Sequence, residues 1–281
     1  MDYRHIIYEP GRVARIILNR PRYLNAQSYL MREEMDDAFR RAAEDDAAGC
    51  IVLSGAGEHF SVGHDIGTQE DVDYCKERGD VGWALDTRNE RFWDQRATFM
   101  ENTLRWRNLP KPTMAMVKGY CIFGGCMFAS AMDVIFAAED ALFLPGTIQF
   151  FHAPWDLGAR KAKEILFEHR YMPAREAMKF GFVNRVFPRE ALEEETLAYA
   201  GRVADNYLRD PFWYRMTKFN INHMQDAMGF SNEIQAGYNN YMVMTGVIRP
   251  ELPHPSEGGF ARTKIAKNNL EASRPWIESE T

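Results

Sequence analysis

Two adjacent glycines, Gly124 and Gly125, stand where this sequence could bind a negatively charged or polarised oxygen. They follow the apolar run 113–117, which is typical of a buried strand, and precede an apolar segment that continues to Met132, long enough for about three turns of helix. The first N–H groups of a helix have no carbonyl partner within it, and the helix dipole favours an anion there. Glycine has no Cβ, so a ligand can approach such a backbone closely. The pattern indicates backbone stabilisation of an oxyanion; the alternative is a tight turn packed in a core.

Composition excludes several kinds of protein. A net charge of −6 over 281 residues argues against general nucleic-acid binding, and no apolar run reaches the length of a membrane-spanning helix. The N-terminus lacks the apolar segment of a signal peptide, and the four cysteines show no CxxC spacing, so we expect a reduced, cytoplasmic setting. The seven histidines show no metal-ligand spacing, and neither GxxxxGK(S/T) nor GxGxxG occurs. We therefore expect neither a metal nor a redox cofactor.

The pattern of apolar residues predicts an α/β chain whose C-terminal part is helical. The predicted strands cover residues 12–18, 50–53, 113–117, 133–138, 141–143 and 182–187. The predicted helices cover residues 25–43, 159–167, 173–180, 189–204, 210–228 and 231–245. The highly charged segment 71–107 is expected to form mobile, mostly helical structure over the site.

The predicted helix 210–228 carries large apolar side chains at helical spacing. We expect most of them to belong to the core, and the alternative is a subunit interface. These residues are Phe212, Trp213, Met216, Phe219, Met224 and Met228.

Five motifs occur in order along the chain. They are Leu18-Asn19-Arg20-Pro21 with Asn25-Ala26; Gly55-Ala56-Gly57 leading to Phe60-Ser61-Val62-Gly63-His64-Asp65-Ile66; Lys111-Pro112; Gly119-Tyr120 with Gly124-Gly125-Cys126; and Asp133. In order and spacing, this set resembles the crotonase (enoyl-CoA hydratase/isomerase) superfamily from about residue 13 to residue 186. The resemblance implies a spiral of ββα units over residues 1–204. It also implies a helical region over residues 205–281 that builds a homotrimer, often doubled into a hexamer.

The resemblance further implies a site for an acyl-CoA thioester, with coenzyme A entering as part of the substrate and no separate cofactor. The family's oxyanion hole has two backbone N–H donors, which correspond here to those of His64 and Gly124. Two fixed donors stabilise an enolate or tetrahedral oxyanion by several kcal/mol. Relatives often carry a small residue at position 64, and His64 departs from that without losing its N–H. We expect the next residue, Asp65, to hold the loop rather than to react.

Other positions are implied to bind the substrate or its coenzyme. They are Arg22, Leu24, Ala26, Ser61, Val62, Gly63, Phe123, Gly125, Met127, Gly146 and Trp155. The Arg22 side chain would meet a phosphate group or remain a solvated charge, with equal weight. Lys264 and Lys267 would reach a neighbouring subunit's coenzyme, although a surface charge is the favoured interpretation.

The family's two catalytic glutamates are missing. Hydratases of this family transfer the protons of water through one glutamate after Gly-Gly-Cys and one after a Phe-x-x-Pro strand end. Those positions hold Met127 and Gly146 here. Neither side chain exchanges a proton, so two-glutamate hydration is disfavoured.

The replacement candidates are His152 and Asp156, in a segment that is glycine-rich in ordinary hydratases. Imidazole titrates near neutral pH, so His152 would act as a general base if it faces the pocket. As alternatives of equal weight, His152 packs beside Phe150 and Phe151, and Asp156 caps the following helix. Four acids of the charged segment are weaker candidates: Asp86, Glu90, Asp94 and Glu101.

Three functions remain in view. The first is hydrolysis, C–C cleavage or isomerisation of a bulky or cyclic acyl-CoA, with oxyanion or enolate stabilisation. The second is enoyl-CoA hydration with displaced acid and base residues. The third is acyl-CoA binding without catalysis.

Overall fold

A six-stranded sheet forms the centre of the protein. The computed structural model describes residues 2–246 and 261–280. The strand order is β1-β2-β3-β4-β6-β9. The bounds are β1 Ile6–Glu9, β2 Val13–Leu18, β3 Cys50–Gly55, β4 Thr113–Val117, β6 Val134–Ala138 and β9 Arg185–Phe187. All neighbours pair in parallel except β1 with β2. Every residue of β3 and β4 is buried, which explains their uninterrupted apolar sequences.

A second, three-stranded sheet lies beside the first. It consists of β5 Tyr120–Ile122, β7 Leu142–Leu144 and β8 Met172–Pro173, in the order β5-β7-β8. The chain therefore alternates: β4 and β6 enter the large sheet, and β5 and β7 follow them into the small sheet. After β5 comes the helix α5 Gly124–Ser130. The predicted strands are confirmed, with ends that differ by a few residues, and the short strands β1, β5 and β8 were not predicted.

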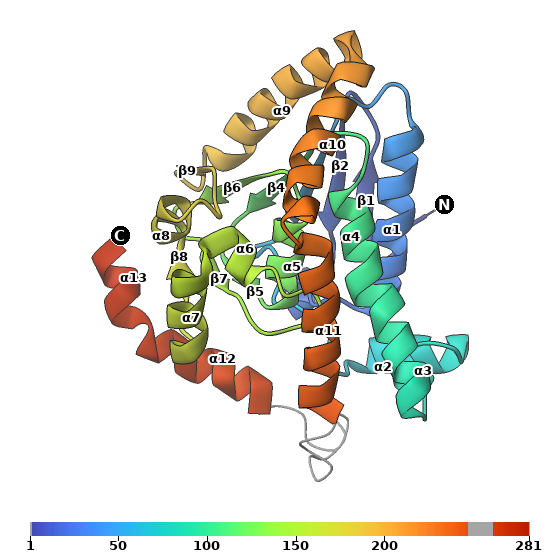
Figure 1. Ribbon diagram of the computed structural model, residues 1–281, viewed down its shortest axis with the longest axis vertical. Helices are drawn as coiled ribbons and strands as arrows, with labels where there is room; N and C mark the ends of the chain where they lie inside the picture. Colours follow the sequence, from blue (N-terminus) through green and yellow to red (C-terminus); the bar gives the residue numbers. More distant parts are fainter. Residues whose placement is uncertain (1, 247–260, 281) are drawn as a thin grey trace.

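Helices cover the sheets on both sides (Figure 1). Their bounds are α1 Tyr29–Glu44, α2 Gln69–Arg78, α3 Arg88–Gln95, α4 Asn102–Arg107, α6 Ala153–Leu157, α7 Ala159–Glu168, α8 Ala174–Lys179, α9 Leu192–Arg209, α10 Pro211–Ala227, α11 Phe230–Gly246, α12 Ala261–Ala272 and α13 Arg274–Glu280. Short 3-10 turns occur at η1 Pro21–Tyr23 and η2 Gly82–Ala84. One segment, η3 Arg96–Glu101, is a π-helix. The charged segment is thus helical, as predicted.

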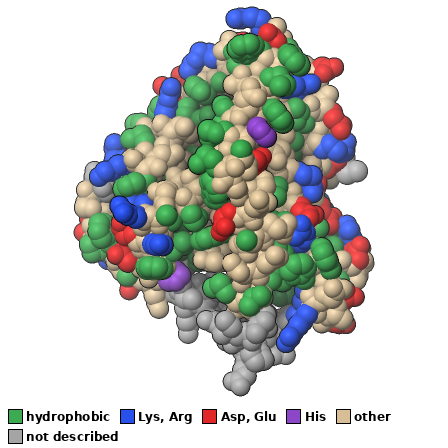
Figure 2. All heavy atoms as spheres, in the orientation of Figure 1, with side chains coloured by type: hydrophobic (Ala, Val, Ile, Leu, Met, Phe, Trp, Pro, Cys, Tyr) green, Lys and Arg blue, Asp and Glu red, His purple; other side chains and the backbone are tan. Residues whose placement is uncertain are grey.

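The core prediction for helix α10 is wrong. None of its residues is buried, and its apolar side chains lie on the surface (Figure 2). The exposed set comprises Phe212, Trp213, Met216, Phe219, Ile221, Met224 and Met228. Helical spacing alone could not distinguish a face packed on the chain's own core from one turned away from it.

Two further expectations concern the domain boundary and membrane-spanning helices. The boundary expected after residue 204 falls inside α9, and the described residues 2–246 and 261–280 contain no helix long and apolar enough to cross a membrane. The side chain of Lys264 lies outside the described residues, and Lys267 is exposed.

Candidate active site

The loop after β3 and the strand β5 are joined by backbone hydrogen bonds. The N–H of Ser61 donates to the carbonyl of Tyr120 at 3.0 Å, and the N–H of Ile122 donates to the carbonyl of Ser61 at 2.9 Å. On the other side of the loop, the N–H of Gln27 donates to the carbonyl of Gly63 at 2.8 Å. The backbone around residue 64 is therefore fixed between the start of α1 and the strand that leads into the glycine turn.

The two predicted donor segments lie in contact because glycines occupy the contact points. A Cβ on Gly63 would lie 2.9 Å from the backbone nitrogen of Gly124, and Gly63 has a φ of +88°. A Cβ on Gly125 would lie 2.4 Å from the carbonyl oxygen of Ser61. Any other residue would separate the segments. The structure thus brings His64 and Gly124 together; that their N–H groups share one oxygen stays a prediction.

The residue before α5 has a strained backbone. Phe123 has a φ of +45°, which a non-glycine residue seldom adopts, and its N–H donates to the carbonyl of Leu144 at 2.7 Å. Such strain is common at functional sites. The helix that follows, α5, is seven residues long, shorter than the three turns predicted. It ends early because the N–H of Asp133 bonds the carbonyl of Thr113 at 3.1 Å, which leads the chain into β6.

The surroundings of both positions of the missing glutamates are unfavourable to an acid, at Met127 because they are apolar and at Gly146 because they are crowded. Met127 is fully buried in an apolar cluster that includes Phe99 and Phe150. A Cβ on Gly146 would lie 2.6 Å from Cδ1 of Phe123, so the ring of Phe123 occupies the space of any side chain at 146. The packing around both positions therefore matches the residues present, Met127 and Gly146, rather than glutamates.

His152 and Asp156 form a pair. Nδ1 of His152 lies 2.6 Å from Oδ2 of Asp156, and the ring of His152 lies between Phe150 and Phe182, with centroids 6.5 and 5.8 Å away. His152 is 1% exposed, and its Nε2 has no hydrogen-bond partner among the described residues. The following helix α7 has no side-chain cap, so the capping alternative for Asp156 is wrong. His152 therefore packs beside aromatic rings, as the alternative expected, and also pairs with Asp156.

The side chains beside Gly124 were not predicted. A Cβ on Gly124 would lie 2.8 Å from Oε1 of Gln27 and 2.9 Å from Nδ1 of His64. The ring of His64 also packs against Phe99, with centroids 4.6 Å apart. Gln27 Oε1 accepts a hydrogen bond from Nη1 of Arg32 at 2.9 Å. Arg32 stands three and seven residues before the buried Met35 and Phe39, and this helical spacing was the available sequence signal.

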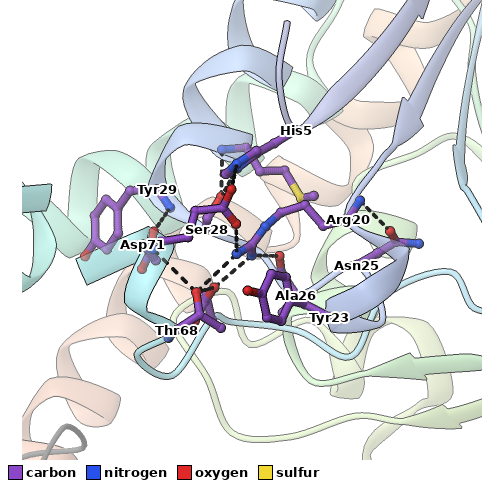
Figure 3. Close-up of polar contacts among 12 residues, drawn as sticks. His5, Arg20, Tyr23, Asn25, Ala26, Ser28, Tyr29, Thr68 and Asp71 are labelled. Atoms are coloured by element: carbon purple, nitrogen blue, oxygen red, sulfur yellow. Dashed lines mark hydrogen bonds and ion pairs between the residues drawn. The ribbon is translucent and has the colours of Figure 1, made fainter. Parts of the chain in front are cut away.

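The buried side chain of Arg20, which Figure 3 shows beside Ala26 and Thr68, holds the loop that carries His64. Nη1 of Arg20 lies 2.7 Å from Oδ2 of Asp65, and it also donates to the carbonyl of Ala26 at 2.7 Å. Asp65 further accepts from the N–H and the hydroxyl of Thr68, at 2.8 and 2.6 Å. Asp65 thus spends its oxygens on the loop, in agreement with the structural role expected for it.

The N-terminal segment supports the same region. Nδ1 of His5 lies 2.7 Å from the hydroxyl oxygen of Ser28 (Figure 3). Its Nε2 lies 3.1 Å from Oε1 of Glu70. Burial lowers the pKa of His5, and the positive charge of Arg20 lowers it further. His5 therefore connects the start of α1 to the start of α2.

Of the residues predicted to bind the coenzyme, some are exposed and others are buried. Arg22 is exposed, and its guanidinium lies over the ring of Tyr23, 4.6 Å from the centroid. Leu24 is 42% exposed, and its carbonyl accepts from the N–H of Val62 at 3.1 Å. Ala26, Ser61 and Gly63 are buried behind them. Trp155 packs against Phe230, with ring centroids 5.2 Å apart, beside the apolar cluster that contains Met127.

The acids of the helical cover have structural partners. Glu90 is exposed and forms a capping box with Thr87, and Glu101 pairs with Arg96 at 2.8 Å. Asp86 is exposed. The hydroxyl of Tyr29 donates to Asp94 at 2.8 Å, and burial raises the pKa of Asp94.

Comparison with known proteins identifies a family for this chain. The model of the enoyl-CoA hydratase/isomerase family matches residues 9–241. EchA13 of Mycobacterium tuberculosis, whose name is that of an enoyl-CoA hydratase, is 35% identical over 82% of this chain and 77% of its own length. A solved probable enoyl-CoA hydratase from Mycobacterium thermoresistibile is 38% identical with a TM-score of 0.76, covering 86% of this chain and 97% of the other. One from Mycobacterium smegmatis is 34% identical with a TM-score of 0.77, covering 91% and 98%.

The family match spans most of the chain, and the solved structures share its overall fold over most of their length. The chain therefore belongs to the enoyl-CoA hydratase/isomerase family and has the crotonase fold.

Proposed function

We propose that this family enzyme acts on an acyl-CoA thioester and stabilises an oxyanion or enolate with the backbone N–H groups of His64 and Gly124. The observation that carries the proposal is the contact between their segments, where a Cβ on Gly63 would lie 2.9 Å from the nitrogen of Gly124. Backbone donors held this rigidly need no rearrangement when charge develops, which is the source of their effect on rate.

The proton transfers belong to groups other than glutamates at positions 127 and 146. Met127 is buried and Gly146 has no room beside Phe123. The paired His152 and Asp156 remain the candidates for acid and base, because a carboxylate that orients an imidazole is a recurrent arrangement in proton transfer. We infer hydrolysis, C–C cleavage or isomerisation of a bulky or cyclic acyl group.

Hydration by displaced acids is the second candidate. What favours it is that EchA13 and the mycobacterial structures carry the name enoyl-CoA hydratase. The substrate-binding positions and the oxyanion site would serve both reactions, so only the product distinguishes them.

The experiment is a screen of acyl-CoA thioesters, including cyclic and β-keto types, with mass spectrometry of the products. Hydrolysis releases free coenzyme A, C–C cleavage divides the acyl group, isomerisation keeps the mass and hydration adds one water to the intact thioester. We expect one of the first three. Hydration alone would support the second candidate, and tight binding without turnover would support a non-catalytic role.

We further propose that the chain works as a homotrimer or hexamer in the cytoplasm, with no metal and no cofactor beyond the coenzyme A of its substrate. The exposed apolar face of α10 supports the assembly.

A further inference from the structure

Arg32 is a buried cation without a paired anion. It is 0% exposed on α1, and among residues 2–246 and 261–280 no carboxylate forms an ion pair with it. Its guanidinium donates only to neutral acceptors: Oε1 of Gln27 (2.9 Å), the carbonyls of Thr98 (2.8 Å) and Phe99 (3.2 Å), Oδ1 of Asn102 (2.9 Å) and the hydroxyl of Thr103 (3.0 Å). Its hydrogen bonds are thus satisfied while its charge is not neutralised.

The other buried arginines of the described chain are neutralised. Arg20 pairs with Asp65 at 2.7 Å, Arg107 with Asp226 at 3.4 Å and Arg170 with Glu176 at 2.7 Å. Burying an unpaired charge is costly, and proteins seldom retain one without a use.

The surroundings keep Arg32 charged at neutral pH. Burial lowers the pKa of Arg32 to about 9, while the negative charge of Asp36 favours the charged form and Arg105 opposes it. Asp36 is itself engaged, because it accepts from Arg105 at 2.8 Å and from Trp106 at 2.9 Å. The guanidinium also lies over aromatic rings, whose faces attract cations. The distances to the centroids are 4.6 Å for Phe99, 5.2 Å for Trp106 and 4.9 Å for Phe128.

Two short paths lead from Arg32 to the oxyanion site. The first is Gln27, whose Oε1 accepts from Arg32 and lies 2.8 Å from where a Cβ of Gly124 would be. The second is the π-helix η3, where Arg32 binds the carbonyls of residues 98 and 99. A π-turn interrupts the regular α-helical ladder, and here it places the ring of Phe99 against His64, with centroids 4.6 Å apart.

We propose that Arg32 is a positioning residue of the oxyanion site, which holds Gln27 and Phe99 in place and makes negative charge more favourable beside Gly124. The inference rests on the proposed function, since it needs an anion at that site. In a low-dielectric interior an unneutralised charge acts on its surroundings with little screening. Arg32 is fully buried and acts through its neighbours.

The test measures the acidity of a bound β-keto thioester. Acetoacetyl-CoA has an acidic α-carbon, and its enolate absorbs in the near ultraviolet, so a pH titration of the complex gives the ligand's pKa. We expect the wild-type protein to lower that pKa relative to the unbound ligand. In Arg32→Met the acid dissociation constant of the bound ligand should be about 10- to 100-fold smaller than in the wild type. This range is at or below the effect of removing one oxyanion donor. Arg32→Lys should recover part of it, and Arg32→Gln should not.

Two controls separate the causes. Arg107→Met removes another buried arginine, which is paired with Asp226 and lies over the ring of Phe230, and should leave the ligand's pKa as in the wild type. Gly124→Ala would place a Cβ against Gln27 and His64 and should abolish the pKa shift by distorting the turn itself.

A folded Arg32→Met protein with the wild-type ligand pKa would overturn the Arg32 proposal, while loss of the shift in Gly124→Ala would leave the proposed function standing. If Arg32→Met does not fold, the comparison of Arg32→Lys with Arg32→Gln decides, and equal ligand pKa values would refute the role of the charge. A wild-type protein that fails to lower the ligand's pKa would reject the proposed function, and the Arg32 proposal with it.

Discussion

Phe123 determines much of what its neighbours can be. Its backbone has a φ of +45° at the start of α5, and its ring lies beside Gly146. Cδ1 of that ring lies 2.6 Å from the place of a Cβ on Gly146, and Cε1 lies 3.0 Å from it. The ring therefore stands where the second glutamate of a two-glutamate site would begin. The absence of an acid at position 146 is therefore linked to the strained turn at Phe123.

Gly146→Ala tests this crowding. The new methyl group must displace the ring of Phe123, so we expect a loss of about 1–3 kcal/mol in the free energy of unfolding. The thermal midpoint should fall by about 2–4 °C for each kcal/mol. The matched control is Gly201→Ala in α9, where the added Cβ meets only the end of the Arg12 side chain, at 3.3 Å. Equal thermal midpoints for the two variants would show that Phe123 yields freely.

The paired His152 and Asp156 make the second residue-scale prediction. If they transfer protons, His152→Ala and Asp156→Asn should each slow the chemical step by about 10²–10⁴-fold. Because Nδ1 of His152 lies 2.6 Å from Asp156, the two losses should not add in the double variant. Turnover is measured on the thioester found in the screen, together with the thermal midpoint.

A purely structural pair would give a different result. Both variants would then lower the thermal midpoint while turnover per folded molecule stayed at the wild-type value. That result would exclude the pair from catalysis and direct attention to the side chain of His64, whose Nδ1 lies 2.9 Å from the Cβ position of Gly124.

At the scale of elements, Asp71 joins three segments over the site. Its carboxylate accepts from the N–H of Tyr29 at the start of α1 and from Nε1 of Trp83 in η2, both at 2.8 Å. Burial raises the pKa of Asp71 from 3.8 to about 6, and the charge of Asp65 adds to the effect. The folded protein therefore binds this proton more tightly than the unfolded chain does.

The sign of the pH dependence follows from that difference. With a folded-state pKa above the unfolded one, the contribution of Asp71 to stability falls as pH rises from about 4 to 6 and stays low above that. Asp71→Asn removes this titration. The stability of Asp71→Asn relative to the wild type should therefore increase by about 2–3 kcal/mol between pH 4 and pH 7.

Denaturant unfolding at several pH values measures this relative stability. A constant difference caused by the lost hydrogen bond does not depend on pH and is read separately. Asp73→Asn, an exposed position on the same helix, is the control for removing a carboxylate from α2. A stability difference for Asp71→Asn that is flat across the range would refute the raised pKa.

The sequence predicts an element well when the residues that cause it are close together in the chain. The strands β3 and β4 are buried throughout, so their apolar runs were sufficient. The strand β1 alternates between buried and exposed residues over four positions, too short a pattern to recognise. The π-helix η3 depends on Arg32, more than sixty residues earlier in the chain, and no local pattern announces it.

The residues of the site also divide into those that the sequence predicted and those that it did not. The segments of His64 and Gly124 were predicted because their glycines stand in motifs that resemble those of the family, and in this chain backbone contacts require those glycines. Gln27 and Arg32 were missed because their roles arise from packing between α1 and η3, which are distant in sequence. The pairing of His152 with Asp156 has the i, i+4 spacing of one helical turn and could have been predicted.

At the scale of the whole molecule, the long helix α10 has no covering partner in the described chain. It runs along the surface between α9 and α11, and its apolar side chains face outward (Figures 1 and 2). Phe212, Met216 and Phe219 follow one face at helical spacing, with exposed fractions of 75%, 40% and 57%. A contiguous apolar surface of this kind marks an interface, and stable interfaces bury more than about 1,000 Å².

We expect light scattering at micromolar concentration to give the mass of three or six chains of 32.5 kDa. Phe219→Glu would bury a charge in the proposed interface without a partner, which is strongly unfavourable, and should shift the protein toward single chains. Phe167→Glu is the matched control, because Phe167 is also an exposed phenylalanine, 80% exposed, on a different helix, α7. A wild-type protein that scatters as a single chain would contradict the assembly. Dissociation by both variants would show that added charge, and not the face of α10, is the cause.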